Sequence, residues 1–102
     1  MKWKPDWPQA KKNLIRWWDR KGLALCLMAP RKTPLELVPE PMCPADLKVR
    51  WTDPKFRADR AEFEMAATHF HAEAFPYFDT QIGPGSLGTF LGSEPHFDPV
   101  TV

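Results

Sequence analysis

The distribution of apolar residues predicts an amphipathic helix near the start of the chain. Four apolar residues recur at helical spacing: Ala10, Leu14, Trp17 and Trp18. Lysines and arginines fill most of the opposite face, as in a helix that covers a core with one side. Asp6-Trp7-Pro8 predicts its start, because aspartate can cap free backbone N–H groups and proline suits the first turn. Gly22 predicts its end as a left-handed cap.

A continuous apolar run at residues 23–28 follows this helix, between Gly22 and Pro30. The run is too short for a helix and predicts a strand buried on both faces, as in a parallel sheet. Residues 29–45 contain five prolines and predict an extended loop. A short helix is expected from residue 45 to 51.

The longest predicted helix begins at Thr52-Asp53-Pro54, with the aspartate as cap and proline at the first position. Its apolar stripe runs to about residue 73 and consists of Phe56, Phe63, Ala67, Phe70 and Ala74. Pro76 prevents the helix from continuing, so residues 75–78 are predicted to be an extended second strand. A short helix is expected over 86–91, and residues 97–102 suggest a further strand or hairpin.

This order of helices and strands is an α/β alternation. The chain supplies two or three strands. That is fewer than a closed eight-stranded barrel needs, since such a barrel takes about 250 residues.

Composition indicates one globular domain. The chain has 102 residues, of which 43% are hydrophobic and 13% aromatic, which is typical of a folded chain with a modest core. No apolar run approaches the roughly 20 residues of a membrane helix, and the N-terminus lacks an apolar signal core. Cys26 and Cys43 do not form a C-x-x-C pair and are interpreted as reduced thiols. We therefore expect a cytoplasmic protein without a membrane partner.

The charges are unevenly distributed. Residues 1–60 hold all 14 Lys and Arg and 7 of the 13 acids, whereas residues 61–102 hold 6 acids and no Lys or Arg. The two parts neutralise each other in a fold or an assembly; alternatively, the first part forms a basic surface for an anionic partner. Nucleic acid is a weak candidate, because tryptophans at helical spacing are more typical of a core than of a stacking platform.

Asp79 is the strongest single candidate for chemistry. It follows the predicted second strand, and α/β proteins bind ligands at the carboxyl ends of strands. A carboxylate there would hold a cationic or N–H-bearing substrate or take part in proton transfer. The alternative is a turn cap formed with Thr80 and Gln81.

The loop after the first strand offers a second candidate group. Met28 ends the apolar run, and Arg31 and Lys32 follow it. Arginine binds carboxylates in a bidentate manner, so this loop would hold a substrate carboxylate. The alternative interpretation is that these are ordinary exposed loop charges.

Metal and cofactor sites are not predicted. His69 and His71 would point to different faces of a helix, and no third ligand has fitting spacing nearby. Gly83-Pro-Gly85 matches neither a P-loop nor a dinucleotide fingerprint. We therefore expect no bound cofactor.

Several motifs taken in order resemble the N-terminal part of uroporphyrinogen decarboxylase-like proteins. They are Trp51-Thr-Asp-Pro54, the long helix, Ala74-Phe-Pro-Tyr-Phe-Asp79, Gly83-Pro-Gly85 and Phe90-Leu-Gly92. The similarity is greater to the divergent bacterial members, and it covers most of the chain. It implies that residues 1–102 form the first part of a (β/α)8 TIM barrel.

The resemblance also implies a class of activity. The family includes the heme-pathway decarboxylase, a lyase, and corrinoid-linked methyltransferases, so the substrate would be a tetrapyrrole or another carboxylated small molecule. Asp79 matches the aspartate that binds the tetrapyrrole N–H groups in the decarboxylase, and it would orient or protonate the substrate. Arg31 approximates the second arginine of the family's Met-Arg-Gln-Ala-Gly-Arg loop and would pair with a substrate carboxylate, while Ala29 replaces the first.

The chain holds too few barrel strands for the whole site, so we expect no catalysis from it alone. The zinc ligands of the methyltransferase branch come from later in the barrel. The competing prediction is a non-enzymatic module in which the Trp-rich first helix and the Phe-rich second helix form a self-association or partner-binding surface. Unpaired barrel-type strands favour homo-oligomers in either case.

Overall fold

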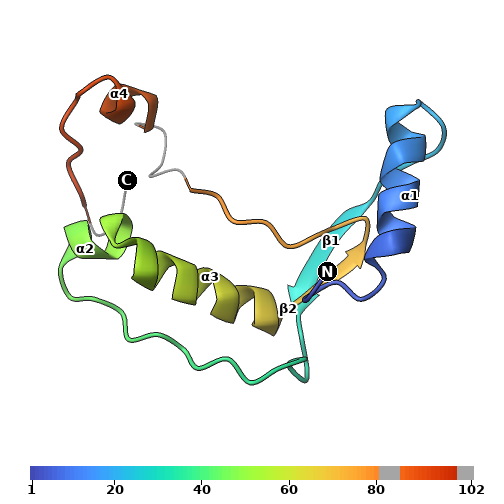
Figure 1. Cartoon of the computed structure of the whole chain (residues 1–102), viewed down its shortest axis with the longest axis horizontal. Coiled ribbons are helices and arrows are strands. Elements are labelled where there is room, and N and C mark those ends of the chain that lie inside the picture. The colour runs from blue at the N-terminus through green and yellow to red at the C-terminus, as the bar shows by residue number, and fades with distance from the viewer. Residues whose placement is uncertain (81–85, 99–102) are drawn as a thin grey trace. The chain divides into compact units, whose positions relative to one another are not determined.

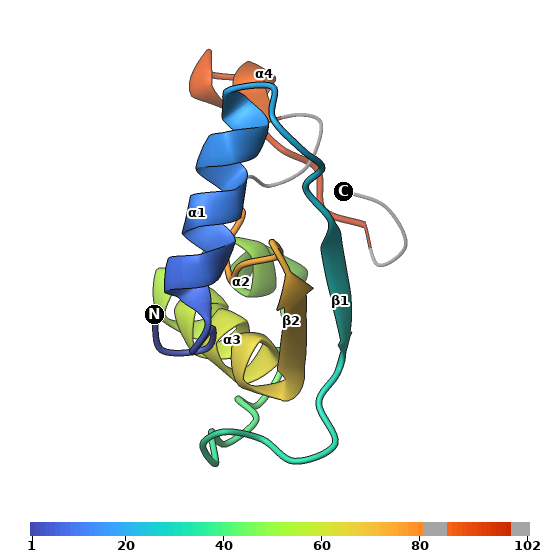
Figure 2. The ribbon, with the colours of Figure 1, turned by 90° about the vertical axis from the view of Figure 1, so that its right-hand side faces the viewer.

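The computed structural model describes residues 1–80 and 86–98 and contains both helices and strands (Figures 1 and 2). The elements are α1 (Trp7–Trp18), β1 (Cys26–Pro30), α2 (Leu47–Thr52), α3 (Pro54–Ala67), β2 (Thr68–Ala72) and α4 (Ser86–Phe90). The chain divides into two compact units. The first unit comprises Met1–Pro39 and Glu62–Tyr77, and the second comprises Glu40–Ala61 and Phe78–Val102.

Helix α1 starts where the sequence predicts, but its two ends use different residues from those expected. The side chain of Asp6 does not cap the helix and instead accepts a hydrogen bond from Lys4 Nζ at 3.0 Å. At the other end Arg20 adopts the left-handed conformation with φ of 59°. Lys21 N–H bonds to Arg16 O and Arg20 N–H to Trp17 O, which is the Schellman pattern. Gly22, with φ of 98°, follows this cap rather than forming it.

The two strands of the first unit pair with each other in antiparallel fashion, with Cys26 opposite Ala72 and Pro30 opposite Thr68. The prediction of a strand buried on both faces in a parallel sheet is therefore wrong. Most residues of β1 are exposed, and none of them belongs to the buried core cluster, to which Phe70 of β2 contributes. The strand also begins three residues later than the apolar run.

The long helix ends earlier than its apolar stripe suggests. Helix α3 stops at Ala67, and Thr68–Ala72 form β2 without an intervening loop. The spacing of Phe70 from its apolar neighbours fits both the apolar face of a helix and the buried face of a strand. The pairing of this segment with β1 makes it a strand. Residues 75–78, predicted as a strand, have no regular secondary structure.

The core of the first unit is small and combines a helix with the strand that follows it. Trp3, Ala66, Phe70 and Ala74 are buried together, and Val38 and Met65 pack against them. Trp7 adds an edge-to-face contact with Phe75, with ring centroids 5.7 Å apart. This core therefore joins the N-terminus to the residues around β2.

The second unit is built from short helices with local caps. Asp46 Oδ1 accepts hydrogen bonds from Lys48 N–H at 2.8 Å and Val49 N–H at 3.3 Å, which starts α2. Asp53 Oδ1 accepts from Lys55 N–H at 3.0 Å, so the predicted cap of α3 is confirmed. The predicted short helix after residue 85 is also confirmed as α4. The prediction of a final strand falls mainly on residues 99–102, outside the described residues, and Phe97 and Asp98 are not in a strand.

Candidate functional site

The loop candidates of the sequence lie at the end of β1, in the first unit. Met28 is 60% exposed on the strand. Arg31 is tied to the neighbouring strand: its N–H donates to Ala67 O at 2.7 Å, and its Nη2 donates to Thr68 O at 3.1 Å. The backbone N–H of Arg31 therefore extends the β1–β2 pairing by one more contact, and its guanidinium adds a second bond to β2. Its role as a substrate ligand stays a prediction.

Asp79 lies in an irregular segment of the second unit, and its side chain is exposed. Arg57 of α3 fixes the backbone there: Nη2 donates to Asp79 O at 3.1 Å and Nη1 donates to Thr80 O at 3.2 Å. The guanidinium also lies over the ring of Phe78, 5.2 Å from its centroid. A planar group with several donors suits this combination of stacking and forked hydrogen bonding. Arg57 thus holds the backbone that carries Asp79.

The structure places Asp79 in one unit and both Met28 and Arg31 in the other. The Gly83-Pro-Gly85 turn that the sequence associates with Asp79 lies outside the described residues. Arg57 was not singled out by sequence reasoning. No local sequence pattern indicates that Arg57 contacts Asp79, because the two residues are 22 positions apart and meet only through the path of the folded chain.

Among the residues that the structure describes, Lys4 has the largest side chain that is fully buried, with 1% exposure. Its Nζ donates to Phe70 O at 2.8 Å and to Ala72 O at 2.7 Å, and it also contacts Asp6. An ammonium group inside a protein needs such acceptors, because burial without partners is very costly. Lys4 therefore fastens the N-terminal segment to the free edge of β2.

Glu73 plays the matching role directly after β2. Its Oε1 accepts from Asn13 Nδ2 and its Oε2 from Leu25 N–H, both at 2.8 Å. The hydrogen bond from Leu25, followed by that from Asn13, lowers the pKa of the Glu73 carboxyl below its ordinary value of 4.5. The carboxylate thereby connects α1 and the segment before β1 to the end of β2.

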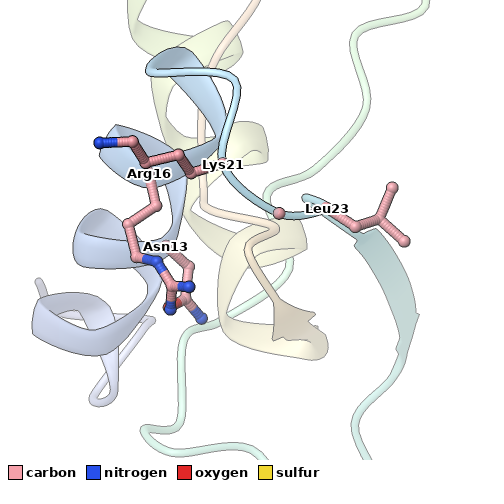
Figure 3. Close-up of a pocket in the computed structure, with 5 residues that line it drawn as sticks. Asn13, Arg16, Lys21 and Leu23 are labelled. Atoms are coloured by element: carbon pink, nitrogen blue, oxygen red, sulfur yellow. The ribbon is translucent and has the colours of Figure 1, made fainter.

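The C-terminal end of α1 carries an uncovered aromatic surface. Trp17 and Trp18 contact each other edge to face, with centroids 6.3 Å apart. With Arg20 and Gly22 they line a hollow of about 570 Å³. A second hollow, of about 270 Å³, is lined by Asn13, Arg16, Lys21, Gly22 and Leu23. Figure 3 shows Arg16 and Asn13 extending side by side and Leu23 pointing away from them. We call the residues Arg16, Trp17, Trp18, Arg20 and Lys21 the α1 end surface.

His69 and His71 lie side by side on β2. Their rings are parallel within 3°, with centroids 3.9 Å apart. Partial desolvation is the main cause that lowers the pKa of His69 below its ordinary value of 6.5, and the neighbouring His71 adds to it. The expectation that the two rings point to different faces is wrong, because it assumed that the helix continued to this point.

Comparisons of the chain with protein-family models, with curated proteins and with solved structures find no match. The part of the chain that the structure describes contains no group of three or more His, Cys, Asp or Glu placed to hold a metal ion. Within the same residues, every helix is too short or too polar to span a bilayer.

Proposed function

We propose that the chain acts by binding protein, and that the α1 end surface is where it binds. The observation that supports this is the change in exposure along one apolar helix stripe. Ala10 is 2% exposed, whereas Trp17 and Trp18, two turns further on, are 48% and 79% exposed. Indole rings gain much from being covered and are enriched at protein interfaces. The uncovered end of the stripe is therefore suited to a partner.

The charge around the two tryptophans favours an acidic counterpart. Arg16, Arg20 and Lys21 lie beside them, so two α1 ends facing each other would repel. The chain itself contains an apolar segment of the opposite charge. In residues 86–98 the side chains of Leu87, Phe90 and Leu91 are largely exposed, and no Lys or Arg occurs after residue 60. We therefore propose self-association, with this segment of a second copy on the α1 end surface.

Light scattering on the purified chain tests this proposal. We expect an oligomer that dissociates in the variants Trp18→Ala and Phe90→Ala and that weakens as salt is raised, because exposed charges are screened. Tyr77→Ala, which removes an exposed aromatic ring outside both surfaces, is the matched control and should leave the oligomer intact. A wild-type chain that is monomeric at every concentration would contradict the proposal.

A second candidate function is binding of a carboxylated or N–H-bearing small molecule at Asp79. It follows from the resemblance to uroporphyrinogen decarboxylase-like lyases and methyltransferases, in which the chain would form the first part of a (β/α)8 barrel. The contact of Arg57 with the backbone of residues 79 and 80 supports it. A fixed backbone is what a ligand-orienting carboxylate requires.

Uroporphyrin, a stable tetrapyrrole, is a suitable probe for this second function. Its absorption and fluorescence should change on addition of the chain, and Asp79→Asn should remove the change. Glu94→Gln is the control, since it deletes one exposed carboxylate of the same unit. Equal responses from the wild-type chain and Asp79→Asn would rule out this role of Asp79.

A further inference from the structure

The two histidines of β2 form a pair that the fold holds on one side of the ribbon. Residues two apart on a strand point to the same face, and their rings stack at 3.9 Å. Phe70, between them in sequence, points to the other face and is buried in the core of the first unit. The strand therefore cannot turn over without exposing Phe70, and the histidine face stays directed outward.

The pairing with β1 fixes the position of each ring. His71 lies opposite Leu27 and His69 opposite Ala29. Both histidines are exposed, so ions in solution reach them. The charged groups near His69 are Asp6, Lys4 and Arg31. Lys4 is bound to Asp6 and to two carbonyls, and Arg31 donates to Thr68 O.

We propose that His69 and His71 together bind a divalent transition metal ion of the kind that prefers imidazole, such as Ni²⁺ or Cu²⁺. A metal–imidazole bond is about 2.0–2.1 Å long, so two rings 3.9 Å apart are close enough to share one ion. The nitrogen lone pairs lie in the planes of the two parallel rings, so each ring must turn out of the stack for both lone pairs to meet at one ion. The χ2 torsion of histidine is broad, and both side chains are exposed, which permits this rotation.

The number of ligands decides which metals suit this site. Structural zinc sites use four protein ligands and catalytic ones three, whereas the described residues offer no group of three here. Tetragonal Cu²⁺ and Ni²⁺ accept two nitrogen ligands and complete their coordination with water. The second imidazole binds intramolecularly, which raises affinity well above that of one histidine.

Calorimetric titration of the untagged chain with NiCl₂ tests the proposal. Nickel is the probe because it does not oxidise the free thiols of Cys26 and Cys43. We expect one ion per chain. The variants His69→Ala and His71→Ala should each weaken binding on the order of 10²-fold, since each leaves a single imidazole.

His96→Ala and Cys43→Ala are the matched controls and should leave the affinity unchanged. Circular dichroism identifies a variant that fails to fold, in which case His69→Gln or His71→Gln takes its place. The proposal is overturned if the wild-type chain does not bind Ni²⁺ at millimolar concentration. It is equally overturned if either control weakens binding as much as the loss of His69 or His71.

Discussion

The contacts inside the first unit differ in kind from those inside the second. In the first unit, buried polar side chains join residues far apart in the sequence: Lys4 bonds to carbonyls 66 and 68 positions away, and Glu73 bonds to Leu25, 48 positions away. In the second unit many polar contacts are local, such as Asp46 with Lys48 and Arg50 with Pro44. Arg57 is an exception, because it reaches residues 79 and 80.

This difference implies unequal sensitivity to substitution. Removal of a buried ammonium group leaves the carbonyl groups that it bonded without a donor. This lowers the free energy of unfolding more than the loss of a partly exposed contact does. Exposed ion pairs contribute little. The first unit should therefore depend on a few residues, and the second on many small contributions.

The largest expected effect is that of Lys4→Met. The substitution leaves the buried carbonyl of Phe70 and the partly buried carbonyl of Ala72 without their donor, so we expect the free energy of unfolding to fall by about 3 kcal/mol. Urea denaturation measures the change. Lys2→Met is the control: Lys2 forms exposed ion pairs with Glu36 and Glu62, and its ammonium lies 4.4 Å from the centroid of the Trp3 ring, but it bonds to no buried carbonyl among the described residues. Equal losses in the two variants would remove the distinction between buried anchors and surface contacts.

A smaller, pH-dependent loss is expected for Glu73→Gln. The carboxyl has a pKa below 4.5 in the folded chain, so its contribution to stability is present above the pKa of the unfolded carboxyl. That contribution disappears as the pH falls through the lowered folded value. Urea denaturation at several pH values should show the wild-type chain as the more stable at neutral pH, with the two curves converging in acid. A gap that stays constant down to pH 3 would argue against a charged Glu73 anchor.

The smallest of the three effects belongs to the second unit. Arg57→Gln removes the donors to Asp79 O and Thr80 O and should cost about 1 kcal/mol, with faster hydrogen exchange in the peptide that contains residues 78–80. Lys55→Gln is the control, because the side chain of Lys55 forms an exposed ion pair with Asp59 on the same helix. If exchange around residue 79 is the same in both variants, Arg57 does not hold this backbone.

Local chemistry predicted the beginnings of the helices well, but not those of the strands. Asp53-Pro54 marks the start of α3, and the periodicity of residues 10–18 marks α1. The boundary at Ala67 could not be predicted, since Phe70 and Ala74 fit the helical period and only pairing with β1 makes residues 68–72 a strand. The pairing of His69 and His71 could not be predicted for the same reason. The two side chains share a face only if residues 68–72 form a strand.

The polar contacts of the candidate sites could not be predicted from the sequence either. Lys4 looks like any N-terminal lysine until the chain brings β2 to it. Asp79 was identified from its neighbours in sequence, whereas its anchor Arg57 depends on a contact across 22 residues. Residue types and spacing therefore indicate candidates, and the path of the chain determines which groups hold them.

The direct passage from α3 into β2 at Ala67–Thr68 limits where this chain tolerates a change of length. A single residue inserted there has no loop to absorb it and would shift the alternation of β2 by one position, moving Phe70 outward and the histidines inward. The proline-rich segment between β1 and α2 has no such constraint. Insertions of one glycine at the two places should therefore differ sharply in the yield of folded protein, as measured by circular dichroism.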